Sequence, residues 1–249
     1  MYMPSPTPVM TDLTEFRRSL RELRPAYNAL LAPQPMRALF DIAFDVVVAF
    51  AAVASMWLSV WLLPAALLLI ANRQRAIGNV LHDAAHHNLW RDERINDAFT
   101  RLIIAPLALV SISAYRDDHF KHHRMLGTVS GDPDYVAPTR HRGGWCWSYC
   151  GLVFQLTAWK SSCVGHLASG CVPWRSKACI VGWWFVFATS LAWFAGPRAA
   201  VLFVAMWLLA RGTFFHLITT FREMCDHYGL RPGGIWSFTR DMTARGFWR

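Results

Sequence analysis

The sequence of 249 residues has little charge: only 16% of its residues are Asp, Glu, Lys or Arg, whereas 54% are hydrophobic. A disordered chain needs many charges and few apolar groups, so the composition excludes one. The hydrophobic share exceeds the roughly 45–50% of soluble domains, and it is gathered into long uncharged blocks. Aromatic residues make up 14% of the sequence, and such side chains collect at the boundary between water and lipid. We therefore expect an integral membrane protein.

Lysine is nearly absent, because Lys121, Lys160 and Lys177 are the only lysines among 25 basic residues; the net charge is +9. A basic balance can indicate nucleic-acid binding. Arginine beside apolar spans more often marks the cytoplasmic face and its anionic headgroups, so no nucleic-acid partner is expected. The six cysteines form no C-x-x-C pair, which argues against zinc fingers and a disulfide framework. The arginine bias is typical of a GC-rich bacterial source and favours a bacterial cytoplasmic membrane.

No cleavable signal peptide is expected, since no apolar core follows an early charge within the first 30 positions. Residues 1–37 are predicted to be a cytoplasmic leader ahead of one membrane domain, and residues 1–249 are interpreted as a single domain. The sequence has no Gly-rich dinucleotide fingerprint and no His-Pro-Gly-Gly haem motif, because Arg231 stands before the Pro-Gly-Gly.

The uncharged blocks predict transmembrane helices. Val46–Ala71 has 26 residues and is broken only by Pro64; about 20 apolar residues span a bilayer. The block is either one tilted helix or, with Leu39–Asp45, a hairpin of two helices. A second hairpin is predicted from Ile180–Ala195 and Ala199–Phe221, which flank the turn signal Gly196-Pro197.

Charge decides between one helix and two in the first block. If both blocks are hairpins, 24 of the 25 basic residues lie on one face, as the positive-inside rule expects. A single first span would leave five N-terminal arginines on the far side. The predicted fold is therefore an all-α membrane bundle of two transmembrane hairpins, about four spans, with cytoplasmic termini.

Two segments between the hairpins are not expected to cross the membrane. Leu102–Ala114 is apolar but has only 13 residues, so a re-entrant or interfacial segment is expected. Trp145–Trp174 mixes Trp, Cys, Lys and Gly, which predicts helices lying on the headgroup surface.

Histidine placement carries the chemical signal. Six of the ten histidines fall in two clusters, H-x-x-x-H-H and H-x-x-H-H, formed by His82, His86 and His87 and by His119, His122 and His123. Residues three or four apart share one helix face, where two imidazoles can hold one metal ion. Six adjacent imidazoles would repel one another if charged, and a metal resolves this by binding their neutral form. The clusters therefore predict a metal site in a cytoplasmic, His-rich helical cap.

Ligand type does not choose the metal, because imidazole suits zinc, copper, iron and nickel. Zinc sites need only three or four protein ligands, which is fewer than the candidates here. Two metal ions fit this number better, and two irons can activate dioxygen.

Together the two boxes, the short apolar segment between them and the following Gly131-Asp132-Pro133-Asp134 resemble the membrane fatty acid desaturases, whose plan is shared by membrane hydroxylases and ketolases. The segment Glu223–Gly229 is similar to a Glu/Asp-His-x-Gly element that carries a further ligand, here His227. The resemblance implies a non-haem di-iron centre with O2 as co-substrate, held by His82, His86, His87, His119, His122, His123 and His227. It also implies a lipid acyl substrate and a separate electron donor of ferredoxin or cytochrome type.

One departure from the family concerns its third box, another H-x-x-H-H, because no histidine follows His227. We expect either a truncated chain or a divergent, incomplete site. Near the ligands, Asp83, Asp118, Asp132 and Asp134 are expected to orient imidazoles or to cap helices. His216 is expected to be a packed polar contact, and His141 and His166 match no box.

The resemblance favours desaturation of an acyl chain. The alternatives are a membrane hydroxylase or carotenoid ketolase, and a non-catalytic membrane protein. An intramembrane zinc protease is a further class, since His82-Asp83-Ala84-Ala85-His86 approaches H-E-x-x-H. The protease hypothesis does not explain the second histidine cluster, His119, His122 and His123.

Overall fold

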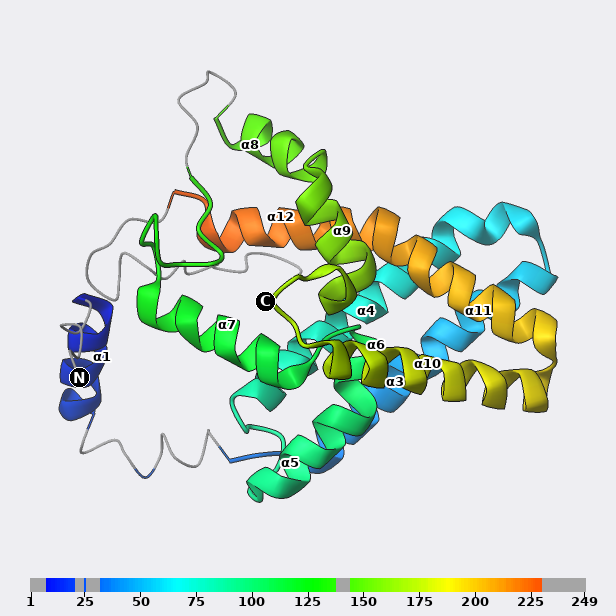
Figure 1. Cartoon of the computed structure of the whole chain (residues 1–249), viewed down its shortest axis with the longest axis horizontal. Helices are drawn as coiled ribbons and strands as arrows, with labels where there is room; N and C mark the ends of the chain where they lie inside the picture. The colour runs from blue at the N-terminus through cyan, green and yellow to red at the C-terminus, as the bar shows by residue number, and fades with distance from the viewer. Residues whose placement is uncertain (1–7, 21–24, 26–31, 138–143, 230–249) are drawn as a thin grey trace, which may run out of the picture. The chain divides into compact units, whose positions relative to one another are not determined.

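The computed structural model describes residues 8–20, 25, 32–137 and 144–229, and in this part of the chain it is helical without a strand (Figure 1). This confirms the predicted all-α class. The chain divides into two compact units: residues 1–30, 117–149 and 222–249 form unit 1, and residues 31–116 and 150–221 form unit 2. Each unit is described by itself.

The helices follow one another along the chain with short connections. The α-helices are α1 (Pro8–Ser19), α3 (Pro35–Ala54), α4 (Leu63–Ala85), α5 (Glu93–Phe99), α6 (Ala105–Leu107), α7 (Ile112–Met125), α8 (Gly144–Val153), α9 (Leu156–Val164), α10 (Trp174–Ala195), α11 (Pro197–Ala210) and α12 (His216–His227). Two π-helical turns, Thr100–Ile104 and Arg211–Phe215, join α5 to α6 and α11 to α12.

The first predicted hairpin is present in unit 2, where α3 packs against α4. Its turn lies at Ser55–Leu62, where the Ser59 side chain accepts a hydrogen bond from the Trp61 N–H. Pro64 does not break a helix but begins one, because it stands in the first turn of α4, where a missing N–H costs nothing. Asp45 of α3 and Arg73 of α4 form an ion pair of 3.0 Å between the two arms.

The second predicted hairpin is formed by α10 and α11, which turn tightly into one another in Figure 1. Gly196 makes the turn with a φ of 90°, and Pro197 begins α11. The returning arm is longer than predicted, since helix continues through the π turn and α12 to His227. The core of unit 2 lies against this arm, with Phe203 and Trp207 almost fully buried.

Three of the described helical stretches are long and apolar enough to cross a membrane: Pro35–Trp57, Trp174–Ala195 and Pro197–His227. The count becomes four if the bent pair Glu93–Leu107 and Ile112–Met125 is one span. The remaining hairpin arm, α4, is not among the three, because polar residues follow its apolar start from Asn72 onward. The protein is thus a membrane protein with three or four candidate spans.

The short apolar segment Leu102–Ala114 is bent, since the chain turns by 91° between α6 and α7. The bend suits a broken span as well as a re-entrant loop, so the expected re-entrant or interfacial position stays a prediction. At the bend Leu109 has a φ of 59°. Its carbonyl accepts a hydrogen bond of 2.9 Å from the His166 N–H, and His166 Nδ1 accepts one of 3.1 Å from the Ser111 N–H. A Cβ on Gly165 would lie 2.3 Å from the Leu109 oxygen, so only glycine fits there. This contact therefore fixes where α7, the helix of the second histidine cluster, begins.

Two indoles connect α10 to the bent segment. Trp183 Nε1 donates to the Leu102 carbonyl at 2.7 Å, and Trp184 Nε1 donates to the Pro106 carbonyl at 2.9 Å. The predicted surface segment Trp145–Trp174 contains the short helices α8 and α9; its position at the headgroups stays a prediction. The N-terminal leader holds α1, and the remainder of residues 1–31, apart from residues 8–20 and 25, lies outside the described residues.

Candidate metal centre

The end of α4 places two predicted ligands on one helix face in unit 2. His82 lies in the last turn and His86 directly follows the helix, with ring centroids 4.9 Å apart. Burial lowers the pKa of His86, and the neighbouring His82 lowers it further. His86 therefore stays neutral, and able to bind a metal, to a lower pH than an ordinary imidazole. The exposed Asp83 has its carboxylate 3.5 Å from His82 Nδ1, where it can orient that ring as expected.

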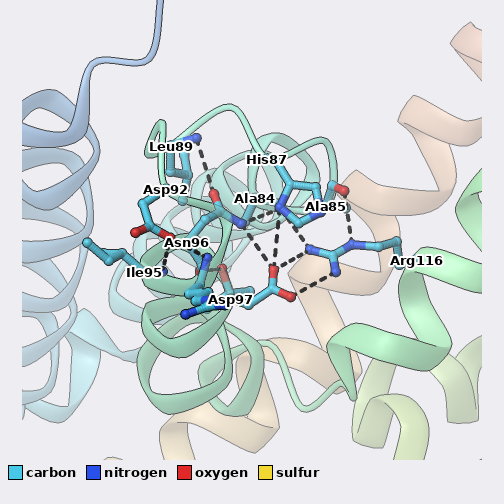
Figure 2. Close-up of polar contacts among 11 residues, drawn as sticks. Ala84, Ala85, His87, Leu89, Asp92, Ile95, Asn96, Asp97 and Arg116 are labelled. Atoms are coloured by element: carbon cyan, nitrogen blue, oxygen red, sulfur yellow. Dashed lines mark hydrogen bonds and ion pairs between the residues drawn. The ribbon is translucent and has the colours of Figure 1, made fainter.

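His87 turns away from this pair because it leaves the helix in the left-handed region, with a φ of 57°. This conformation costs a residue other than glycine about 1–2 kcal/mol. Its ring faces Asp97 of α5, with Nδ1 3.6 Å from the carboxylate (Figure 2). His87 Nδ1 is buried and has no hydrogen-bond partner among the described residues. The cluster thus separates into a pair and a third imidazole that faces a carboxylate.

The segment around His87 is held by polar groups that the sequence analysis did not identify. Asn96 is completely buried; its amide donates to the Ala84 carbonyl at 2.9 Å and accepts from the Leu89 N–H at 3.3 Å. Arg116 donates to the Ala85 and Ala84 carbonyls at 3.0 and 3.2 Å. These carbonyls belong to the last turn of a helix, where oxygens lack helical partners. The sequence signal for this arrangement is Asp92, a residue that favours a helix start. Its side chain accepts hydrogen bonds from two N–H groups and caps α5, the helix that carries Asn96.

In unit 1, α7 brings His119 and His123 together. Their Nε2 atoms are 3.0 Å apart and their ring centroids 4.5 Å apart. The spacing of four therefore gives the facing pair that was predicted. Asp118 is exposed and has no hydrogen bond or ion pair with any described residue, so no contact supports its expected orienting role.

His122 is buried with 6% exposure, and its ring centroid lies 5.6 Å from that of His123. The Nδ1 atom of His122 lies 2.6 Å from Asp132 Oδ1. Asp132 is buried as well, and it also accepts hydrogen bonds from the N–H groups of Gly127 and Asp134, at 2.8 and 2.9 Å. A carboxylate only accepts, so the contact assigns the proton of neutral His122 to Nδ1 and leaves the lone pair on Nε2 for a metal. The expected orienting role of Asp132 thus has a geometric basis.

His227, at the end of α12, lies beside this group. Its ring centroid is 4.7 Å from that of His122, and potential ligand atoms of His122, Asp134 and His227 lie within 4.8 Å of one another. A parallel bridge between Val136 and Tyr228 joins the two chain segments. Loss of solvent around Asp134 raises the pKa of its carboxyl, against the lowering effect of His122 and His227.

The side chains of His122, Asp134 and His227 in unit 1 are suited to binding a metal ion. His227 Nδ1 is buried without a hydrogen-bond partner in the described part of the chain, and a metal would supply one. Ligand atoms around one ion with bonds of roughly 2.1 Å stand about 3.0–3.5 Å apart. The ligand atoms of His122, Asp134 and His227 would need to approach one another by about 1–2 Å, which side-chain rotation can supply. Two imidazoles and a carboxylate are a ligand set typical of non-haem iron.

The other histidines have structural positions. His216 is buried, with Nδ1 2.9 Å from Ser162 Oγ and Nε2 3.0 Å from the Val153 carbonyl, which confirms the expected packed contact. His166 supports the bend before α7, a role that no local pattern signals. His141 and residues 230–249 lie outside the described residues.

Comparison with known proteins gives two results. Residues 55–248 match the protein family described as fatty acid desaturase. The dihydrorhizobitoxine desaturase of Bradyrhizobium elkanii is 34% identical over 121 residues, which is 48% of this chain and 32% of that protein. The aligned part is thus about a third of that relative's length.

Proposed function

Because the chain belongs to the fatty acid desaturase family, which its match over residues 55–248 establishes, we propose that it is an O2-dependent, non-haem di-iron oxidoreductase. Its reaction would introduce a C=C double bond into the acyl chain of a membrane lipid. The observation that carries the proposal is the group of His122, Asp134 and His227, in which the buried Nδ1 of His227 has no hydrogen-bond partner among the residues that the structure describes. The membrane helices support a substrate that is itself dissolved in the bilayer.

The residues proposed to hold the two irons are the seven histidines of the predicted set: His82, His86, His87, His119, His122, His123 and His227. The carboxylate of Asp134 would join His122 and His227. When bound, the metal pair would supply the activation of dioxygen needed to remove hydrogen from an unactivated methylene. The protein supplies binding, orientation and exclusion of water. His122 presents Nε2 because Asp132 holds its Nδ1 proton. Burial lowers the pKa of His86, which favours the neutral imidazole that a metal needs.

Electrons are proposed to come from a separate ferredoxin or cytochrome type protein. An acidic surface on such a donor would be attracted to the net charge of +9. The positive-inside distribution of arginine favours a cytoplasmic face for the histidine clusters and both termini, in a bacterial cytoplasmic membrane.

A second candidate substrate comes from the relative. The Bradyrhizobium elkanii protein is named for dihydrorhizobitoxine, so a small molecule of that kind is the alternative to an acyl lipid. Hydroxylation or ketolation remains the competing outcome within the same chemistry. The products distinguish these options, because desaturation removes two hydrogens and hydroxylation adds one oxygen.

The test is to express the chain in a bacterial host and to purify it from membranes in detergent. Iron and zinc per chain are measured by elemental analysis, and membranes are supplied with labelled saturated lipid, dihydrorhizobitoxine and an electron donor. We expect about two irons per chain and an alkene product. His227→Ala should lose iron and product, whereas His216→Ala, which removes a buried imidazole with protein partners, should keep its iron. One zinc without iron would favour the protease reading, and iron well below two per chain would favour a non-catalytic protein.

A further inference from the structure

The side chain of His87 faces a carboxylate that no sequence pattern connects with it. His87 Nδ1 lies 3.6 Å from Asp97 Oδ1, ten residues further along the chain. That nitrogen is buried and has no hydrogen bond within the described residues. In Figure 2 the imidazole lies directly beside Asp97, on the side that also faces Arg116. The carboxylate is therefore the acceptor best placed for an Nδ1 proton.

Asp97 is itself held in position by Arg116. The guanidinium binds it in a fork, with Nη2 2.8 Å from Oδ1 and Nη1 3.3 Å from Oδ2. The same guanidinium donates to the carbonyls of Ala84 and Ala85, the two residues that end α4. Forked pairs of this kind fix the direction of a carboxylate as well as its distance. Arg116 thus connects the end of α4, from which His87 departs, to Asp97 on α5.

The backbone of His87 points to the same conclusion. Its left-handed φ of 57° is unusual for a residue with a Cβ. Such conformations persist where the surroundings over-determine them, and they concentrate at ligand sites. Here the surroundings are the polar contacts of Asn96 and Arg116 to the preceding carbonyls. A surface ion pair would not require this arrangement of the adjoining backbone.

We propose that Asp97 is a positioning residue for His87: its carboxylate accepts the Nδ1 proton, fixes the ring and leaves Nε2 for a metal, while Arg116 fixes Asp97. This inference rests on the proposed function, since it requires His87 to be a metal ligand. A carboxylate behind a ligating imidazole fixes its tautomer and raises its basicity, and its loss costs about 10–100-fold in metal affinity. The gap of 3.6 Å is expected to close to hydrogen-bonding distance when Nε2 binds a metal.

The test measures Co(II) affinity of the purified, metal-free chain by its visible absorption and by competition with a chelator. Asp97→Asn should weaken binding about 10–100-fold, because its amide can donate to Nδ1 and favour the tautomer with a protonated Nε2. Asp97→Glu should recover part of the affinity. In a His87→Ala background, Asp97→Asn should change the affinity by less than twofold, since residues that act through one another are not additive.

A matched control separates positioning from folding. Asp92→Ala removes the N-cap of the same helix, α5, so it should lower the unfolding temperature of the metal-free chain without changing Co(II) affinity. Equal effects of Asp97→Asn with and without His87 would overturn the inference while leaving the proposed function intact. An unchanged affinity in His87→Ala would remove His87 from the ligand set and overturn the inference as well. Failure of the unmodified chain to bind Co(II) or iron would overturn the proposed function.

Discussion

Asp132 provides the sharpest prediction, because one buried carboxylate accepts three hydrogen bonds near a proposed ligand. Oδ1 faces His122 Nδ1 and the Asp134 N–H, and Oδ2 faces the Gly127 N–H. In Asp132→Asn one of the two oxygens becomes an NH2 group, so at least one donor meets a donor. Leaving a buried donor unsatisfied costs about 1–3 kcal/mol. The metal-free protein should be destabilised by that amount.

The same substitution should affect metal binding separately. If the amide nitrogen faces His122, it favours the tautomer in which Nε2 carries the proton and has no lone pair to give. Loss of an orienting carboxylate typically lowers metal affinity 10–100-fold, which corresponds to about 1.4–2.8 kcal/mol. Iron per chain after dialysis against a graded chelator series gives this number, and thermal unfolding of the metal-free chain in detergent gives the stability change.

Asp118→Asn is the matched control for this prediction. It makes the same chemical change on the same helix as His122, at an exposed carboxylate without a hydrogen bond or ion pair to a described residue. It should leave stability and iron affinity within experimental scatter. If Asp132→Asn and Asp118→Asn retain iron equally well, the Asp132–His122 contact does not orient a ligand and the reasoning fails.

Three other changes test the fold and its electrostatics. Gly165→Ala should lower the unfolding temperature strongly, because the new Cβ would lie 2.3 Å from the Leu109 oxygen at a φ of 55°; Gly151→Ala, with open space around it, should not, and similar unfolding temperatures would contradict the close packing at this bend. His216→Ala should lower the free energy of unfolding by about 1–3 kcal/mol, since it removes a buried imidazole that bonds the partly buried Ser162 Oγ and Val153 carbonyl. Unfolding in urea measures this loss, and a neutral result would argue against the contact. The pKa of His86 is lowered in the folded state, so the stability that neutral His86 contributes is present above the unfolded pKa of about 6.5 and is lost as pH falls through the folded pKa. The metal-free chain should therefore become less stable on acidification, and His86→Asn should make its unfolding temperature depend less on pH. A steeper pH dependence in His86→Asn would contradict the argument.

The helical hairpins could be predicted because their signals are local. An uncharged run long enough to span lipid and a Gly196-Pro197 pair need no information from distant residues. The exact turn of the first hairpin was less accessible, because Pro64 suits a helix start as well as a break. In the structure Pro64 stands at the helix start, and the turn precedes it at Ser55–Leu62.

The histidine pairs of the candidate site could be predicted from their spacing, but the groups that hold them in place could not. Spacings of three and four place histidines on a helix face, and both resulting pairs are present. The direction of His87 depended on a left-handed backbone angle and on contacts with α5 and α7, which lie ten to thirty residues away. Asp97, Arg116 and His166 were not identified for the same reason: an isolated Asp, Arg or His has no pattern until the fold supplies its neighbour. Asp132 was identified because it belongs to the Gly131-Asp132-Pro133-Asp134 motif that follows the second histidine cluster.

The two units use carboxylates in the same way. His122 has Asp132 behind its Nδ1, and His87 has Asp97. A ligand set made only of neutral imidazoles leaves the charge of a divalent metal uncompensated, and this is costly close to a low-dielectric membrane. Within the described residues no arginine forms a hydrogen bond or ion pair with Asp132, whereas the charge of Asp97 is shared with Arg116. Asp132→Asn should therefore reduce affinity for a divalent ion more than Asp97→Asn does. The two losses of Co(II) affinity can be compared as a ratio. This ratio separates the electrostatic effect of a carboxylate on metal affinity from its effect on the imidazole tautomer.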